Sequence, residues 1–337
     1  FKLKDINSKN KNISLIGRPN LIMSRQRKLQ NRVKLLKESE KLQLRLLIND
    51  LNYLESDKFL ELEENSRSKI IDALIDYFQY RKNEGLYSIN EKNREKILLS
   101  RSKLPIIEEI LPYELTKSPI EGTPPMRFRI GSVLNGVLGP ALELGVWANY
   151  HDLLGDETGH LLNAEVVTLD LKIQIRESSI DVSQFQLFNI QKYALNPTGI
   201  PGEYEWSWRA KALWERKNLG CLKCRIFRTS GGIGRSFYLT RKDLEYVFLE
   251  MFLETPEESF SNTSIGLSPK IGFTFSPVDF WKIKVELGHF KSFYGIKKEY
   301  IRSKFDQRFS LYQNLDFRFE IEYFENLEGS FVLHYFW

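Results

Sequence analysis

Apolar and polar side chains alternate along the chain from about residue 127 to the carboxy-terminus. In one run, the odd positions from Val167 to Ile175 are all aliphatic, while the even positions from Thr168 to Arg176 are all polar. Successive side chains of a β-strand point to opposite faces, so a period of two predicts strands with one apolar and one polar face. This pattern constrains the fold more than any other feature of the sequence.

The alternating segments are numerous and long. We count about twelve of them, near residues 127–138, 140–150, 163–177, 180–195, 204–217, 224–238, 243–254, 263–275, 279–290, 303–313, 315–325 and 329–337. Many reach about nine to eleven residues, which is the length of a tilted transmembrane strand and exceeds that of most soluble strands. An even number of strands is typical of bacterial single-chain barrels. The pattern therefore predicts an antiparallel β-barrel of about twelve strands.

Period alone leaves two orientations of the barrel open. Apolar side chains inside would make a soluble barrel that binds a ligand, whereas apolar side chains outside would make a membrane barrel. The six tryptophans, with many tyrosines and phenylalanines, lie mostly near the ends of the runs or on their apolar faces, where membrane barrels carry aromatic girdles. A soluble barrel of this size would also have a wide interior to fill. We therefore predict an outer-membrane barrel over residues 127–337.

The last strand ends the chain on an apolar, aromatic face. That face carries Phe331, Leu333, Tyr335 and Trp337, and the opposite face carries Val332, His334 and Phe336. A terminal strand in open solvent would normally fray and be polar. We predict that this strand closes the barrel and that Trp337 serves as a membrane-interface anchor and insertion signal.

The residues before the barrel have a helical period. Leucines and other apolar residues recur at three and four positions from Leu21 to about Leu54, and further helices are predicted at about 63–82 and 90–102. We expect a linker at 1–20, an antiparallel helical module at 21–104 and an extended connector at 105–126. The connector is predicted from its five prolines, at 105, 112, 119, 124 and 125.

Charge is concentrated at the amino-terminal end. Residues 1–50 hold 13 Lys and Arg against 4 Asp and Glu, although the whole chain carries a net charge of only +5. A basic helix could lie on anionic lipid headgroups or bind nucleic acid. No aromatic residues interleave these charges as single-strand binding requires, so we interpret the stretch as a solvated helix surface and predict no nucleic-acid partner.

His151 and Asp152 are the most site-like pair in the chain. An imidazole beside a carboxylate could act as a general base. Adjacent residues of a strand point to opposite faces, but Gly155, Asp156 and Gly159 indicate that the strand has ended here. The alternative is a structural turn in which Asp152 caps backbone amides and His151 bonds a loop. We keep both residues as weak catalytic candidates.

The remaining motifs favour structure over chemistry. Cys221 and Cys224 are one Cys-Leu-Lys-Cys pair, which lacks the four ligands of a structural zinc site and lies between β-like runs, so a small disulfide is predicted. The stretch 230–234 is glycine-rich but lacks the strand, helix and lysine context of a phosphate-binding loop. Its glycines favour a bend or a close backbone approach. We predict no metal and no cofactor.

The order of several motifs resembles a known family. The relevant segments are Gly17-Arg18-Pro19-Asn20, Leu98-Leu99-Ser100-Arg101-Ser102-Lys103-Leu104, Tyr150-His151-Asp152-Leu153-Leu154-Gly155, Trp206-Ser207-Trp208, Cys221-Leu222-Lys223-Cys224 and Ser230-Gly231-Gly232-Ile233-Gly234. Together they resemble the carboxy-terminal part of the Lnb-type periplasmic family of Gram-negative bacteria, whose namesakes are lipoprotein N-acyltransferases with a catalytic cysteine. Where that family tends to have Gly-His after a proline pair, this chain has Met126-Arg127.

The resemblance implies what this segment does. The catalytic cysteine and histidine of such proteins lie upstream of the Arg-Pro segment, and Phe1 follows no initiator methionine, so we expect this chain to be part of a longer protein. It would be the helical adaptor and outer-membrane anchor of a cysteine-dependent acyltransferase, with no catalysis of its own. The alternatives are a non-catalytic interaction barrel and a soluble periplasmic lipid-binding barrel. Expected partners are outer-membrane lipids and other envelope proteins or lipoproteins, with the helices in the periplasm.

Overall fold

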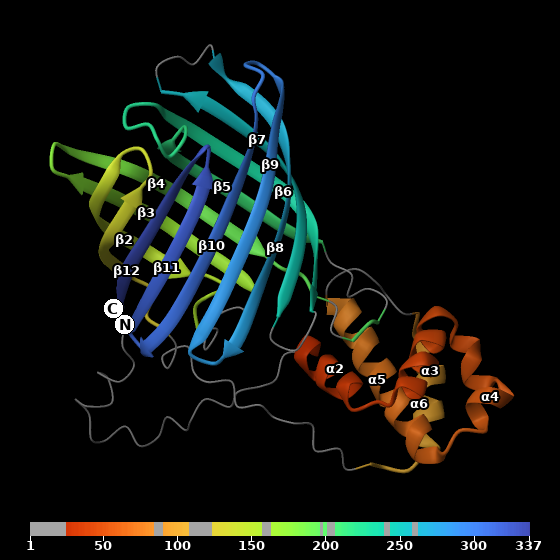
Figure 1. Cartoon of the computed structure of the whole chain (residues 1–337). Coiled ribbons are helices and arrows are strands. Elements are labelled where there is room, and N and C mark those ends of the chain that lie inside the picture. Colours follow the sequence, from red (N-terminus) through yellow and green to blue (C-terminus); the bar gives the residue numbers. More distant parts are fainter. Residues whose placement is uncertain are drawn as a thin grey trace, which may run out of the picture. The chain divides into compact units, whose positions relative to one another are not determined.

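The computed structural model describes residues 25–83, 90–107, 123–156, 163–195, 198–200, 206–238, 243–257 and 262–337. The chain divides into two compact units, shown in Figure 1. One, the helical unit, comprises Phe1–Leu115 and Asn196–Tyr204, and the other, the barrel unit, comprises Thr116–Leu195 and Glu205–Trp337. The predicted linker at 1–20 and most of the predicted connector at 105–126 lie outside the described residues.

The barrel unit is a closed barrel of twelve antiparallel strands. The strands are β1 (Arg127–Asn135), β2 (Gly139–His151), β3 (Ala164–Arg176), β4 (Ser179–Lys192), β5 (Ser207–Arg216), β6 (Arg225–Tyr238), β7 (Leu244–Pro256), β8 (Ser264–Val278), β9 (Trp281–Tyr294), β10 (Glu299–Tyr312), β11 (Leu315–Phe324) and β12 (Asn326–Phe336). Each strand pairs with its neighbours in the sequence, and β12 closes the barrel on β1. The predicted mainly β fold, with about twelve strands, is confirmed.

Closure of the barrel fixes which end each connection occupies. Arg127 of β1 is paired with Phe336 of β12, and we call the end of the barrel at which they lie the terminal end. At the opposite end, the distal end, the connections range from the single residue Glu325 between β11 and β12 to the eight residues between β5 and β6. Glu325 has a φ of 59°, and the last strand begins at Asn326, three residues earlier than the sequence pattern indicated. The β2–β3 and β4–β5 connections, which are longer, lie at the terminal end.

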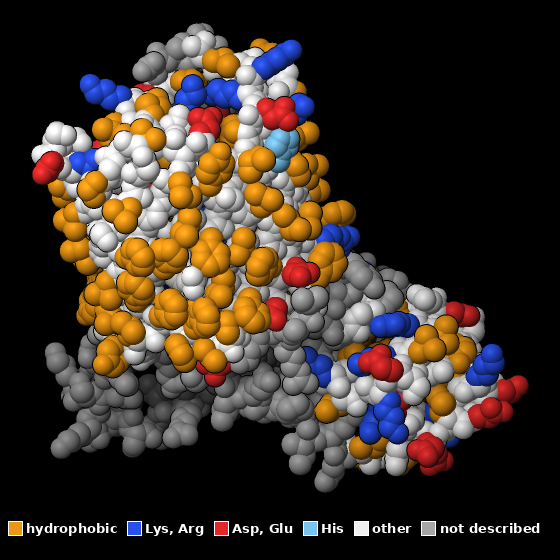
Figure 2. Space-filling model, in the orientation of Figure 1, with side chains coloured by type: hydrophobic (Ala, Val, Ile, Leu, Met, Phe, Trp, Pro, Cys, Tyr) orange, Lys and Arg blue, Asp and Glu red, His pale blue; other side chains and the backbone are white. Residues whose placement is uncertain are grey.

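The outer face of the barrel is apolar. Figure 2 shows hydrophobic side chains over the outside of the strands, with charged side chains near one end. On β12, Phe331, Leu333, Tyr335 and Trp337 are exposed, whereas Val332, His334 and Phe336 are buried. A soluble lipid-binding barrel would need the reverse arrangement, so the predicted orientation of a membrane barrel is correct.

Exposed aromatic side chains gather at both ends of this apolar surface. At the terminal end they are Trp206, Phe237, Tyr238, Phe280, Tyr312, Tyr335 and Trp337. At the distal end they are Phe227, Phe293, Tyr294 and Tyr323. Between them lie aliphatic side chains such as Ile130, Leu249 and Ile271, all exposed. Two aromatic girdles around an aliphatic belt are the surface that a transmembrane barrel presents to lipid.

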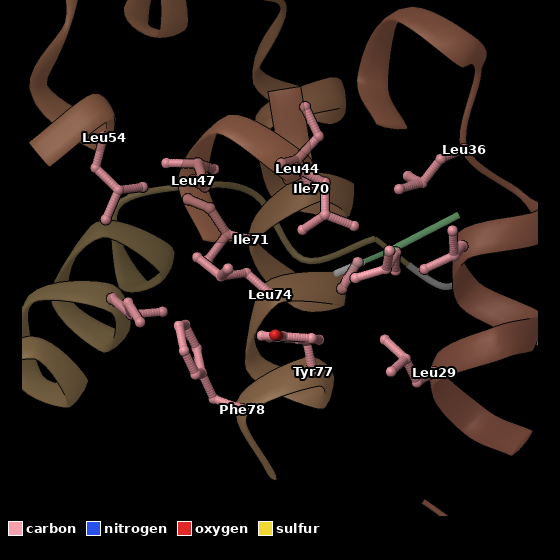
Figure 3. Close-up of a cluster of buried hydrophobic side chains, with 14 of the residues drawn as sticks. Leu29, Leu36, Leu44, Leu47, Leu54, Ile70, Ile71, Leu74, Tyr77 and Phe78 are labelled. Carbon is pink, nitrogen blue, oxygen red and sulfur yellow. The ribbon is translucent and has the colours of Figure 1, made fainter. Parts of the chain in front are cut away.

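The helical unit packs around a leucine- and isoleucine-rich core, which Figure 3 shows. Its helices are α2 (Arg25–Lys34), α3 (Glu38–Asn49), η1 (Leu51–Glu55), α4 (Asp57–Leu60), α5 (Glu64–Asn83) and α6 (Glu91–Ser102). Leu29 of α2, Leu44 and Leu47 of α3, and Ile70 and Leu74 of α5 meet there, all fully buried. Ile200, from the β4–β5 connection, is part of the same core and is 1% exposed. None of the described helices is long and apolar enough to cross a membrane.

The helix predicted over 21–54 is broken into shorter pieces, so that part of the prediction is wrong. The amides of Leu35 and Leu36 bond to carbonyls three residues back, and Lys37 is extended, with a ψ of 158°. The Glu40 side chain accepts a hydrogen bond from the Lys37 amide at 2.8 Å, which starts α3. Asp50 then accepts from the Asn52 amide at 2.9 Å and ends that helix. These local caps outweigh the continuous apolar period.

Basic residues of α2 are paired with acidic residues of α5. Asp76 lies 2.8 Å from Arg32 Nε and 2.9 Å from Lys28 Nζ. On the same face, Asp72 receives two hydrogen bonds from Arg101 of α6, at 2.7 and 3.1 Å. These basic side chains therefore serve the packing of the helical unit.

Candidate functional site: the barrel lumen

The polar face of each strand lines the inside of the barrel with charge. On β11 the inward side chains are Asp316, Arg318, Glu320 and Glu322, and outward residues such as Tyr323 are exposed. A charge buried without a partner is strongly unfavourable, so these groups have to pair across the lumen. The pairs decide how much of the lumen stays open.

One network is centred on Arg209 of β5. Its guanidinium lies 2.7 Å from Glu250 of β7 and 3.1 Å from Glu286 of β9. Lys270 of β8 binds the second oxygen of Glu250 at 2.9 Å, and the Tyr246 hydroxyl donates to Glu286 at 2.9 Å. Four strands that are spread over half the barrel are thereby joined through their side chains.

A second network is centred on Glu215 of β5. This carboxylate accepts hydrogen bonds from Arg302 of β10 at 2.9 and 3.0 Å, and it also pairs with Arg228 of β6. Arg228 binds Glu254 at 2.8 Å, and Arg302 also binds Glu322 of β11. The network therefore spans the lumen from β5 to β11. Removing one partner of such a buried pair typically costs about 3–5 kcal/mol.

Little open space remains between these side chains. The larger cavity has a volume of about 170 Å³ and is lined by residues of most strands. A smaller one, of about 50 Å³, lies nearer the distal end, among Glu143, Gln174, Arg216 and Glu328. In the described part of the chain, the lumen is thus bridged by side chains, with polar cavities between them.

The segment Asp152–Gly155, which we call the inward loop, lies against lumen side chains at the terminal end. Asp152 binds Arg318 at 2.6 Å and accepts a hydrogen bond from the Gly155 amide at 2.8 Å. Arg308 Nη1 donates to the Leu154 carbonyl and Lys282 Nζ to the Gly155 carbonyl, both at 2.9 Å. Cations from three successive strands, β9, β10 and β11, therefore hold this loop.

Apolar contacts fix the same loop. Leu153 is buried in a cluster with Tyr193, Leu244, Tyr246 and Phe248. The Leu153 amide also donates to Glu165 at 3.3 Å, and Glu165 pairs with Lys284 of β9. The loop is therefore a built part of the barrel interior that narrows its terminal end.

The two weak catalytic candidates lie at the start of this loop. His151 is the last residue of β2 and is buried. Asp152 forms an ion pair with Arg318 and accepts a hydrogen bond from the Gly155 amide. The geometry of Asp152 is that of the structural turn weighed above. Sequence reasoning missed Arg318 as the partner of Asp152 and Arg308 as the partner of the Leu154 carbonyl, because both arginines lie more than 150 residues further along the chain.

A buried histidine lies close to the same end. The Nδ1 atom of His334 is 3.0 Å from Asp316 and 3.0 Å from Arg127. The Arg127 guanidinium stacks over Trp147, 3.7 Å from the ring centroid. This cluster joins β1, β2, β11 and β12, so His334 helps to hold the seam at which the barrel closes.

The cysteine pair and the glycine-rich stretch lie in the wall. Cys221 and Cys224 are joined by a disulfide in the β5–β6 turn at the distal end. At Gly232, an added Cβ would come within 2.6 Å of the Leu249 carbonyl oxygen of β7, so the glycine permits a close backbone approach. Among the described residues, no group of three or more His, Cys, Asp or Glu side chains could hold a metal ion.

Fold and lumen together define a transmembrane β-barrel with a bridged interior. Residues 116–335 match the family described as "Domain of unknown function (DUF7840)", which is more than half of the chain. The chain belongs to this family. A search of curated proteins finds no match.

Several solved outer-membrane proteins have a similar fold. The NanC porin is 9% identical, with a TM-score of 0.38 over 63% of this chain and 99% of that one. The KdgM porin is 10% identical, with a TM-score of 0.36 over 62% of this chain and 98% of that one. An outer membrane channel from Pseudomonas putida F1 is 7% identical, with a TM-score of 0.38 over 68% of this chain and 100% of that one.

Proposed function

We propose that this chain is an outer-membrane anchor, which holds a helical module and a preceding Lnb-like, cysteine-dependent domain at the periplasmic surface. The observation that carries the proposal is the combination of a lipid-facing exterior with a lumen bridged by ion pairs. The exterior supplies a stable place in the membrane, and the bridged lumen favours a rigid scaffold over a wide diffusion pore.

The role of such an anchor is positional. An acyltransferase that acts on lipoproteins needs a phospholipid donor and a lipidated amino-terminus in the same plane. Holding the catalytic domain at that plane raises the effective concentration of both substrates. The barrel takes no part in the chemistry in this account, because Asp152 and the arginines around it are engaged in fixing the inward loop.

The second candidate is a non-catalytic interaction barrel of an envelope complex. It shares the membrane setting, and the resemblance to the Lnb-type family is what favours the anchor of an enzyme. The sequence of the full-length protein separates the two. An upstream catalytic cysteine and histidine support the enzyme, and their absence supports the interaction barrel.

Cell fractionation tests the membrane part of the proposal. The chain, expressed with a secretion signal in a Gram-negative host, should be recovered in outer membranes. It should resist extraction by salt and should migrate differently in gels before and after heating. Release by salt without detergent would contradict the anchor.

A further inference from the structure

Two lysines face the larger lumen cavity without a carboxylate in direct contact. Lys172 of β3 and Lys211 of β5 both line it. Within the described residues, neither makes a hydrogen bond or an ion pair, whereas the neighbouring Lys270 and Lys284 bind Glu250 and Glu165. A lysine that faces a polar cavity without a direct ion pair is a candidate for binding an anion.

The wall of this cavity is biased toward positive charge. Eleven Lys and Arg side chains line it against seven Asp and Glu, an excess of four. Carboxylates that balance these cations, such as Glu143, Glu215, Glu250 and Glu254, do not line the cavity. They are buried and paired in the surrounding wall. Cations therefore outnumber carboxylates at the cavity surface.

Neutral hydrogen-bond donors flank Lys211. In the sheet, Lys211 is paired with Asn189 of β4 on one side and with Ser230 of β6 on the other. Both residues line the same cavity. Asn189 accepts from Gln191 through Oδ1 at 2.9 Å, which leaves its amide group as a donor. A lysine amine, an amide and a hydroxyl thus lie side by side on three adjacent strands.

We propose that the cavity binds one small tetrahedral oxyanion, of the phosphate or sulfate class, at Lys211, Asn189 and Ser230. Such an ion is rich in acceptors, which matches the three donors. A cavity of about 170 Å³ has room for such an ion together with surrounding waters. The site does not depend on the anchoring role.

Equilibrium dialysis with radiolabelled inorganic phosphate tests the site. The full chain, folded in detergent and verified by heat-modifiable migration, should bind one phosphate per chain. Lys211→Gln should raise the dissociation constant about tenfold or more, since a charged donor is lost. Lys211→Arg keeps a cationic donor at this position and should retain binding. This result would show that the loss in Lys211→Gln comes from the missing charge and not from a disturbed barrel. Lys297→Gln, the same charge change at an exposed turn residue, should leave the constant unchanged.

Competition identifies the ion class. Sulfate should displace phosphate, and chloride at the same ionic strength should do so far less. Absence of phosphate binding by the folded wild-type chain would overturn the proposal. Unchanged binding by folded Lys211→Gln would overturn it as well.

Discussion

At the scale of single residues, alternation separates most of the side chains that face lipid from those that face the lumen. Val167 is an exception, since it belongs to the apolar set of its run but is buried and lines the larger lumen cavity. Phe331, Leu333, Tyr335 and Trp337 point outward, as their spacing of two indicates. The partners of inward charges could not be predicted, because Arg209 and Glu286 meet across the lumen from positions 77 residues apart. Several strands carry inward Asp or Glu side chains, and the local sequence does not indicate which of them will pair with a given arginine.

Arg318 should be one of the most sensitive residues of the barrel. Its guanidinium binds Asp152 at 2.6 Å and lies 3.4 Å from Asp316, so Arg318→Ala leaves two buried or half-buried carboxylates without this cation. We expect a loss of about 3–5 kcal/mol in the free energy of unfolding. Urea unfolding in detergent, followed by tryptophan fluorescence, measures it.

Lys291→Ala is the matched control for Arg318→Ala. Lys291 is 65% exposed and pairs at 3.4 Å with the exposed Glu299. Exposed ion pairs contribute about 0–1 kcal/mol, so this variant should unfold close to the wild type. Similar losses for both variants would show that the inward loop is not held as described.

At the scale of elements, strand positions were predictable and helix breaks were not. Each of the twelve alternating runs overlaps one of the twelve strands, although their ends differ by a few residues and register shifts interrupt the period between β3 and β4, β4 and β5, and β8 and β9. The break between α2 and α3 depends on a hydrogen bond from the Lys37 amide to Glu40. Apolar residues keep their helical spacing across this break, so the spacing does not reveal where one helix ends and the next begins. The contribution of Ile200 to the helical core was hidden for a different reason, since that residue lies between two strands of the barrel.

Ile200 should therefore stabilise the helical unit even though it lies in the β4–β5 connection. Ile200→Ala removes a side chain that is 1% exposed, and we expect a loss of about 2–5 kcal/mol in the free energy of unfolding of this unit. Thermal melting followed by circular dichroism at the helix band measures it. Ile106→Ala, at a residue that is 91% exposed, should leave the melt unchanged. Equal melts for the two variants would contradict this assignment.

The end of β12 should be required for assembly. Tyr335 and Phe336 pair with Phe128 and Arg127 of β1, and the Trp337 amide donates to the Met126 carbonyl at 3.1 Å. Deleting the last three residues removes these closing contacts and part of the terminal girdle, so outer-membrane assembly should fail. Cell fractionation and heat-modifiable migration in gels measure whether the truncated chain is assembled in the outer membrane. Normal assembly of the truncated chain would refute the proposed insertion signal.

At the scale of the whole molecule, the barrel combines two properties that follow from one pattern. The apolar half of the alternation forms a belt for lipid, and the polar half fills the lumen with ion pairs that cross from strand to strand. A twelve-stranded barrel is wide enough to leave a passage when its side chains do not bridge it. Here the networks of Arg209 and Glu215, with the inward loop at the terminal end, occupy that space.

Ion conductance in planar lipid bilayers tests this account most directly. The folded chain, with its insertion verified by heat-modifiable migration from proteoliposomes, should give no stable conductance steps in molar potassium chloride. Arg308→Ala combined with Arg318→Ala, which frees the inward loop, should give larger and more frequent openings if it still folds. Stable open steps of the size of a general diffusion porin from the wild-type chain would contradict a bridged lumen and, with it, the anchor as the main role of the barrel.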